Sequence, residues 1–118
     1  MEKRQGYPKY LRLSGRAAID TAFRQGRYHR LGVLHAKALP TELETARYLI
    51  SVKKAIGTAV ERNRIKRLVR EAIRRHRHQL RRPHDVCLFL TARPGHALTL
   101  AEIDKEIVNL FQRLDTAG

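Results

Sequence analysis

The side chains that hydrolytic enzymes use for acid–base catalysis are scattered along this sequence. Aspartate occurs only at positions 20, 85, 104 and 115, and no two of these positions fall in a recognisable catalytic motif. Acid–base or metal-assisted cleavage needs clustered carboxylates or histidines that share a metal ion. His76 and His78 are two positions apart on a predicted helix, so they point about 200° from each other and cannot bind one metal jointly. We therefore expect no catalytic residue and no metal ligand on the polypeptide.

The strongest pattern is one of binding, in the stretch from Gly57 to Arg82. This stretch holds 10 of the 25 lysines and arginines and predicts a helix that starts near Thr58. One stripe of the helix, about 140° wide, is apolar, which is typical of a helix packed on a globular core. The rest of its circumference is cationic except for Glu61 and Glu71. The stripe consists of Ile65, Leu68, Val69, Ala72, Ile73 and His76.

Six residues over about two turns of this helix have the chemistry to bind a polyanion. Arginine forks match phosphate groups, and asparagine can hydrogen-bond a base edge or a sugar hydroxyl. A solvated charged face is the alternative, but such faces usually mix charges of both signs. Gly57, just before the helix, could let a phosphate approach the backbone or could form a tight turn. The six residues are Arg62, Asn63, Arg64, Lys66, Arg67 and Arg70.

Composition narrows the partner further. The formal charge is +14 and the isoelectric point is about 11.1, which favours nucleic acid as the partner. An anionic membrane is disfavoured because the apolar stripe has no Trp or Phe to insert, and an acidic protein is a third possibility. The single cysteine, Cys87, excludes an internal disulfide and is expected to be a buried structural thiol. Without a signal-like or membrane-spanning segment, we expect a cytoplasmic location.

Three helices are expected in one domain, residues 1–118, after a basic arm over residues 1–14. The first helix should run from Arg16 to Gln25, with Ser14 as its N-cap and Gly26 ending it at the C′ position. The basic helix follows and should break at Pro83. The last helix should begin after Thr99 and end near Leu114, with Glu102 completing a capping box. Its apolar stripe is Ile103, Ile107, Leu110, Phe111 and Leu114.

Three strands are expected between these helices. Alternation predicts a strand from Arg30 to Ala38 and a second from Arg47 to Lys53, which would pair as a hairpin. The apolar run from Asp85 to Thr91 predicts a covered, central strand, in which Asp85 would cap a turn or pair with an arginine. The order α-β-β-α-β-α indicates an α+β fold, a two-layer sandwich of sheet and helices. The basic helix is long enough to join two parallel strands, and such crossovers are generally right-handed.

One family shares the order and spacing of several motifs of this chain, over about Leu11 to Leu114. The motifs are Arg47, Ser51-Val52-Lys53-Lys54-Ala55-Ile56-Gly57, Ala59-Val60-Glu61-Arg62-Asn63-Arg64-Ile65-Lys66-Arg67-Leu68-Val69-Arg70-Glu71, Asp85-Val86 and Ala92-Arg93. In these motifs, and in the segment from Phe23 to Gly26, the sequence resembles the protein subunit of bacterial ribonuclease P. The Arg-Asn-Arg helix is the most specific of them.

The resemblance implies an accessory protein that binds a catalytic RNA and the 5′ leader of precursor tRNA. Together they would remove the leader endonucleolytically and give the mature tRNA 5′ end. The RNA would hold the catalytic metals, so the holoenzyme would require Mg²⁺ while the protein alone binds no cofactor. The partners would be the catalytic RNA and precursor tRNA, with no membrane and no DNA. The resemblance also implies a left-handed crossover carrying the Arg-Asn-Arg helix, against the general rule.

The resemblance assigns two sets of RNA-binding residues. The residues that would contact the catalytic RNA are Arg62, Asn63, Arg64, Lys66, Arg67 and Arg70. Those that would line the leader cleft are Ile19, Phe23, His35, Lys53 and Lys54. Phe23 could equally be a core residue. The chain departs from the family where Ile19 replaces a usual phenylalanine and His35 a common aromatic residue. Leu49, Ala55 and Thr58 also replace a usual glycine and two lysines.

Two other functions remain as alternatives. A non-catalytic RNA-binding protein, such as a ribosomal component, would have the same charge and would co-purify with ribosomal subunits instead of one discrete RNA. A stand-alone nuclease would cleave after all RNA had been removed. The absence of a catalytic constellation disfavours the second alternative.

Overall fold

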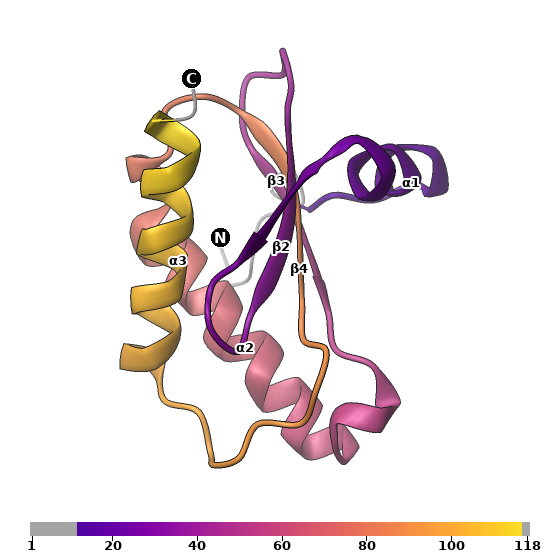
Figure 1. Cartoon of the computed structure of the whole chain (residues 1–118), viewed down its shortest axis with the longest axis vertical. Helices are drawn as coiled ribbons and strands as arrows, with labels where there is room; N and C mark the ends of the chain where they lie inside the picture. The colour runs from indigo at the N-terminus through magenta and orange to yellow at the C-terminus, as the bar shows by residue number, and fades with distance from the viewer. Residues whose placement is uncertain (1–11, 117–118) are drawn as a thin grey trace, which may run out of the picture.

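The computed structural model describes residues 12–116, which form a four-stranded sheet with three α-helices (Figure 1). Most of the expected basic arm lies outside the described residues. The predicted α+β class is confirmed, with one strand more than expected. None of the helices in residues 12–116 combines the length and apolar character that a membrane crossing requires. In chain order the elements are α1 (Arg16–Gln25), β1 (Arg27–Arg30), β2 (His35–Pro40), β3 (Arg47–Ser51), the 3₁₀ turn η2 (Lys54–Ile56), α2 (Ala59–His76), the 3₁₀ turn η3 (Arg77–Gln79), β4 (His84–Phe89) and α3 (Leu100–Thr116).

The strands lie in the order β1-β2-β4-β3. β4 pairs antiparallel with β2 and parallel with β3, so the expected parallel pairing of the strands on either side of α2 is confirmed. The hand of that crossover stays a prediction. The expected hairpin between segments 30–38 and 47–53 is wrong, because β4 lies between β2 and β3. Five of the six residues of β4 are buried, which agrees with its predicted central place.

Segment 30–38 does not form the single predicted strand. It contains a turn at Gly32 that joins β1 and β2 into an antiparallel hairpin. The backbone N–H groups of Val33 and Leu34 donate to the carboxylate of Glu106 on α3, at 3.2 and 2.8 Å. A Cβ at Gly32 would lie 2.6 Å from Oε2 of the same carboxylate. Because Glu106 is remote in sequence, the local alternation of apolar residues could not reveal this turn.

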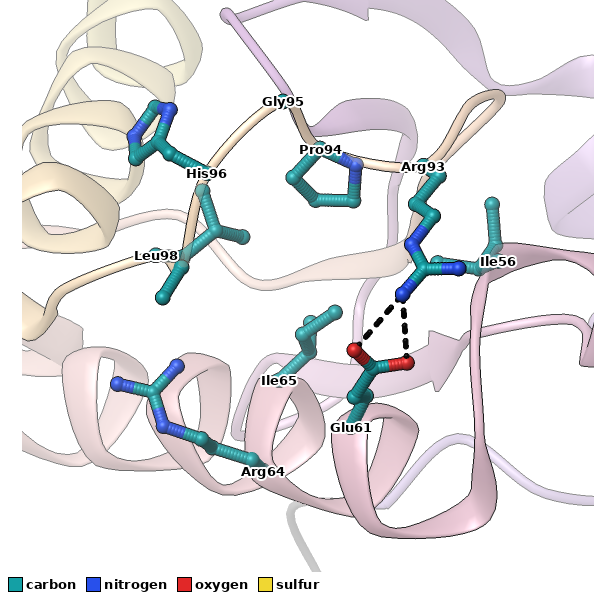
Figure 2. A pocket seen from close by; sticks show the side chains of 10 residues that line it. Ile56, Glu61, Arg64, Ile65, Arg93, Pro94, Gly95, His96 and Leu98 are labelled. Carbon is teal, nitrogen blue, oxygen red and sulfur yellow. Dashed lines mark hydrogen bonds and ion pairs between the residues drawn. The ribbon is translucent and has the colours of Figure 1, made fainter.

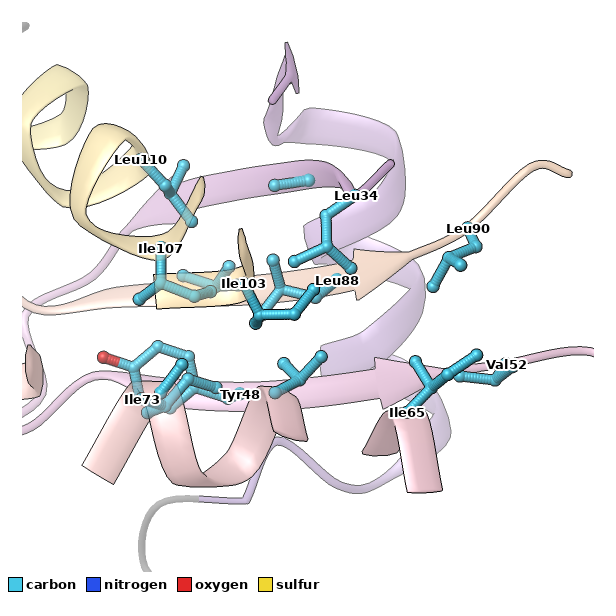
Figure 3. Close-up of a cluster of buried hydrophobic side chains, with 14 of the residues drawn as sticks. Leu34, Tyr48, Val52, Ile65, Ile73, Leu88, Leu90, Ile103, Ile107 and Leu110 are labelled. Atoms are coloured by element: carbon cyan, nitrogen blue, oxygen red, sulfur yellow. The ribbon is translucent and has the colours of Figure 1, made fainter. Parts of the chain in front are cut away.

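The sheet separates two hydrophobic clusters. α2 and α3 cover one face, where they build the main core, and α1 packs on the other (Figures 1 and 3). Along β4, Val86 and Leu88 point into the main core, whereas Cys87 belongs to the cluster under α1. The expected burial of Cys87 is confirmed, and this burial raises the pKa of its thiol to about 11.

The helical stripes predicted from apolar spacing are confirmed. Apolar residues of both helices meet the sheet in the main core, which removes them from water. His76 of the α2 stripe is half-buried, with its Nε2 3.2 Å from Asp104. The buried stripe positions are Ile65, Val69, Ala72 and Ile73 on α2, and Ile103, Ile107, Leu110, Phe111 and Leu114 on α3.

The ends of α1 differ from expectation in detail. Ser14 is not its N-cap: the cap is Gly15, with φ 90°, and no side chain caps the helix there. That φ is one glycine adopts readily, so the chain can turn into the helix at Gly15. Gly26 does end α1, but in extended conformation with φ −70°, not in a left-handed one. Glycine is needed there because a Cβ would lie 2.3 Å from the carbonyl oxygen of Ala22.

Both hydrogen bonds of the capping box predicted for α3 are present. The Thr99 backbone N–H donates to the Glu102 carboxylate at 2.9 Å, and the Glu102 N–H donates to Thr99 Oγ1 at 3.2 Å. The box satisfies amides at the helix start that have no partner within the helix.

Asp85 pairs with an arginine, which was one of the two roles expected for it. Its carboxylate accepts two hydrogen bonds from Arg47 across the β3–β4 pair, at 2.9 and 2.7 Å.

We expect two buried histidines to make the fold less stable as the pH drops below about 6.5. Burial, and then the charges of Arg113 and Arg27, lower the pKa of His29; burial also lowers the pKa of His84. The unfolded chain therefore binds more protons than the native one between the native pKa values and 6.5. The stabilisation is complete above 6.5 and is lost as the pH falls through the native values, by up to about 1.4 kcal/mol per pH unit for each histidine.

Denaturant unfolding between about pH 5 and 7.5 measures this dependence. A His29→Asn/His84→Asn variant should have a shallower slope of unfolding free energy against pH than the unsubstituted chain. His78→Asn, at an exposed position, is the control and should keep the slope. An equal slope in the double variant and the unsubstituted chain would contradict a role for these two histidines.

Candidate RNA interface

The residues expected to contact the catalytic RNA lie together on the N-terminal half of α2. Positions three and four apart are neighbours on a helix surface, so the six side chains form one continuous patch. We call these six residues the basic patch. Its exposed members are Asn63, Arg64 and Arg67, and its half-buried members are Arg62, Lys66 and Arg70.

The acidic side chains of α2 pair with cations outside the basic patch. Glu61 pairs with Arg93 at 2.9 Å, and Glu71 pairs with Arg74 in the next turn. Within residues 12–116, no member of the basic patch makes an ion pair with a carboxylate. Its positive charge is therefore not neutralised by that part of the chain, which leaves the guanidinium forks open to phosphate.

The N-terminus of α2 is held by a capping box. The Thr58 backbone N–H donates to Glu61 Oε1 at 2.8 Å, and the Glu61 N–H donates to Thr58 Oγ1 at 3.1 Å. The Thr58 backbone donor, and then the Arg93 guanidinium, lower the pKa of Glu61. A Cβ at Gly57 would lie 2.5 Å from Glu61 Oε1, so glycine makes room for this carboxylate. Arg62 Nε donates to the Gly57 carbonyl at 3.2 Å, which ties the basic patch to the same turn.

A pocket of about 360 Å³ lies between this end of α2 and the loop that joins β4 to α3 (Figure 2). Arg93 reaches from the loop to Glu61, and its Nη2 donates to both carboxylate oxygens at 3.1 and 2.9 Å. Arg64 of the basic patch lines the same pocket. The sequence placed Arg93 in a family motif but did not predict its contact with α2. The apolar side chains of the pocket are Ile56, Ile65 and Leu98, with Pro94 and Ala97.

The expected leader-cleft residues are only partly brought together, on the α1 face of the sheet. Phe23 of α1 and His35 at the start of β2 do not stack on each other, but both contact Phe89 of β4. The ring centroids lie 5.8 Å apart for Phe23 and Phe89, and 5.5 Å apart for His35 and Phe89. Phe23 is half-buried, so it combines packing with an accessible edge. Ile19, also half-buried, packs on the cluster around Cys87.

Lys53 and Lys54 lie in the segment that connects β3 to α2. Both side chains are exposed, and Lys53 is the N-cap of η2. β3 runs beside β4, where Ser51 is the partner of Phe89, and η2 leads into the start of α2. We call the α1 side of the sheet, where the rings around Phe89 lie, the aromatic face. Along the chain, the two lysines lie between the aromatic face and the basic patch.

Sequence reasoning missed the side chains that complete the aromatic face. Phe89 belongs to a run that is apolar at every position, so the spacing could not say which face it occupies. Tyr28 stacks on His35, with ring centroids 5.7 Å apart, but it precedes the turn that the sequence did not predict. Lys37 Nζ donates to the carbonyl oxygen of Phe23 at 3.1 Å and places a cation beside the rings. If the bounds of β2 had been known, the alternation of side chains along the strand would have placed Lys37 on the same face as His35.

Fold and surfaces together define a small, strongly basic α+β protein. The chain belongs to the ribonuclease P protein family, because the family model described as Ribonuclease P matches residues 7–115. Within residues 12–116, no three His, Cys, Asp or Glu side chains are grouped so that they could hold a metal ion.

Relatives and solved structures agree with this family. The ribonuclease P protein component of Desulforapulum autotrophicum is 34% identical over 108 residues, which cover 92% of each chain. That of Dictyoglomus thermophilum is 33% identical over 112 residues, or 95% of this chain and 92% of the relative. The RNase P protein of Staphylococcus aureus has a similar fold, with a TM-score of 0.74 at 23% identity, covering 86% of this chain and 93% of that one. The Thermotoga maritima RNase P protein gives 0.75 at 23% identity, covering 86% and 96%.

Proposed function

We propose that this chain is the protein component of a ribonuclease P holoenzyme, which binds a catalytic RNA and precursor tRNA and promotes removal of the 5′ leader. The observation that carries the proposal is the basic patch. It has the Arg-Asn-Arg order on one helix, and none of its cations pairs with a carboxylate within residues 12–116. A phosphate backbone supplies the missing anions.

In this proposal α2 is the docking surface for the catalytic RNA. Its arginines bind phosphate groups bidentately, and Asn63 hydrogen-bonds a base edge or a 2′-hydroxyl. The main core holds the opposite side of the helix against the sheet, and the Thr58–Glu61 box holds its start. The side chains are therefore presented from a rigid element, which reduces the entropy lost on binding.

The aromatic face under α1 is the proposed site for the single-stranded leader. The half-buried ring of Phe23 packs on Phe89, which also stacks on His35, so these rings form one continuous aromatic surface beside which unpaired bases can stack. Ile19 adds apolar contact, and Lys53 and Lys54 place charge between this face and the basic patch. Leader and catalytic RNA would then occupy different surfaces of one small protein.

Chemistry in this proposal belongs to the RNA, which supplies the magnesium-dependent cleavage step. The polypeptide binds and orients: it neutralises phosphates where the two RNAs approach each other, and it holds the leader in one path. Neutralisation by fixed cations lowers the concentration of free Mg²⁺ needed to bring two polyanions together. The holoenzyme would act on RNA in the cytoplasm, with neither DNA nor membrane as a partner.

Reconstitution at low magnesium tests the proposal. The chain alone should leave precursor tRNA uncut. Together with the catalytic RNA of its own organism, it should raise cleavage at Mg²⁺ concentrations where the RNA alone is slow, because it replaces part of the counterion requirement. The measurement is the rate of leader release against Mg²⁺ concentration. Polylysine of equal total charge is the control and should not reproduce a preference for precursor over mature tRNA.

Two results would contradict the proposal. The first is that adding the protein changes neither the affinity of the catalytic RNA for its substrate nor its magnesium requirement. The other is cleavage by the protein after ribonuclease treatment has removed all RNA, which would support a stand-alone nuclease.

A further inference from the structure

Tyr28 is a half-exposed aromatic side chain on the edge strand of the sheet. Its relative exposure is 50%, and its strand, β1, pairs only with β2 in the described sheet. In the register of these strands Tyr28 lies opposite Lys37, which lies opposite Cys87. Because cross-strand partners share a face, Tyr28 projects on the α1 side, the same side as Phe23 and Phe89.

His35 holds the Tyr28 ring in place. The Tyr28 hydroxyl is hydrogen-bonded to Nδ1 of His35, and Nε2 of the same imidazole is hydrogen-bonded to Thr91 Oγ1 at 3.1 Å. The His35 ring also stacks between Tyr28 and Phe89, with interplanar angles of 26° and 20°. His35 is only 9% exposed, so it offers little open surface of its own. The accessible ring at this end of the aromatic face is therefore Tyr28, and it is already ordered.

The surroundings of Tyr28 are cationic. Arg30 lies opposite His35 on the same face of the hairpin, and Lys37 lies opposite Tyr28 itself. Exposed rings beside fixed cations are the arrangement with which proteins bind single-stranded nucleic acid: bases stack on the rings and the phosphates follow the charges. A protein partner would be expected to cover apolar side chains here, but besides the His35 ring the neighbours of Tyr28 in the β1–β2 register on this face are the cations Arg30 and Lys37.

We propose that Tyr28 is a base-stacking residue for single-stranded RNA and that His35 is the residue that positions it. The inference rests on the proposed function: the RNA is the leader of precursor tRNA. The row of rings Phe23–Phe89–His35–Tyr28 extends the leader site from α1 to the outer edge of the sheet. Leader nucleotides farther along the row reach Tyr28, so this residue sets how long a leader the protein can bind.

The experiment uses the reconstituted holoenzyme and precursor tRNAs whose leaders are shortened one nucleotide at a time. The unsubstituted protein should gain affinity with each added nucleotide until the leader has passed Tyr28. Tyr28→Ala should lose the last step of this gain, about fivefold or more, while affinity for the shortest leaders stays unchanged. Tyr28→Phe keeps the ring and should retain most of the step. Tyr28→Leu keeps apolar surface without a ring and should therefore lose the step as Tyr28→Ala does.

His35→Ala tests the positioning role through the same readout. It should reduce the step that Tyr28 provides, and combining it with Tyr28→Ala should remove no more of that step than Tyr28→Ala alone. Normalising to the shortest leader removes any general loss of folded protein, which would lower affinity for all leaders equally.

The outcomes separate this inference from the proposed function. If Tyr28→Ala keeps the full dependence on leader length while Phe23→Ala loses it, the role of Tyr28 is wrong and the leader site stands. If Tyr28→Leu binds as well as Tyr28→Phe, stacking is wrong. If the unsubstituted holoenzyme shows no dependence on leader length, the leader site itself is wrong, and the inference falls with it.

Discussion

Replacing Arg47 by alanine is expected to lower the free energy of unfolding by about 3–5 kcal/mol. The Asp85 carboxylate has only 7% of its side chain exposed, and it accepts both of its charge-assisted hydrogen bonds from Arg47. Truncating the arginine leaves a buried charge without its partner, at a position that is almost fully removed from water. Since a domain of this size is stable by about 5–15 kcal/mol, such a loss is a large fraction of the total.

Equilibrium unfolding in urea measures the effect, with two variants as references. Arg74→Ala breaks the exposed pair with Glu71, whose side chains are 57% and 40% exposed, and should change stability by no more than about 0.5 kcal/mol. Arg47→Met/Asp85→Leu removes both charges and should recover most of the loss, because no buried carboxylate is left unpaired. If Arg47→Ala were as mild as Arg74→Ala, the pair would not be a stabilising feature of the β3–β4 contact.

The double variant Arg64→Ala/Arg67→Ala should bind the catalytic RNA much more weakly and with less dependence on salt. Each phosphate contact contributes about 0.7–0.9 to the slope of log affinity against log salt, so the slope should fall by about 1.4–1.8. Each lost charge-assisted hydrogen bond should lower affinity about tenfold or more. Both side chains are exposed on α2, so the substitutions should leave the fold intact. Titrations from about 50 to 200 mM salt give the slope.

A charge-matched control separates contact from net charge. Arg82→Ala/Arg113→Ala also removes two positive charges, but Arg82 lies just before β4 and Arg113 in the last turn of α3, away from the N-terminal end of α2 (Figure 1). This control should lower affinity only slightly and keep most of the slope. A slope unchanged in the Arg64→Ala/Arg67→Ala variant would contradict phosphate contact at those two positions.

The two surfaces make different demands on the fold. The basic patch is carried by a single helix, and the main core needs only to hold that helix against the sheet. The aromatic face combines Phe23 of α1, Tyr28 of β1, His35 of β2 and Phe89 of β4, so it exists only when the sheet has its final order. A loss of sheet register would therefore disrupt the proposed leader site before the basic patch.

Local physics explains what could be predicted from the sequence alone. The α2 and α3 stripes follow from helical spacing, and the Thr99–Glu102 box involves residues only three apart. The central place of β4 follows from its uninterrupted apolar run. The basic patch was predictable for the same reason, since its residue types and spacing lie within about two turns of one helix. Its assignment to one RNA partner came from the resemblance, not from charge or spacing.

Contacts between distant segments decided the rest. Glu106 binds the turn that divides β1 from β2, and Arg93 binds the start of α2, each across more than 30 residues of sequence. The insertion of β4 between β2 and β3 placed Phe89 between Phe23 and His35 and left Tyr28 at the edge. Apolar periodicity reports which side of an element is buried, but it carries no record of which element lies opposite. The basic patch is therefore a property of the local sequence, whereas the aromatic face is a property of the folded sheet.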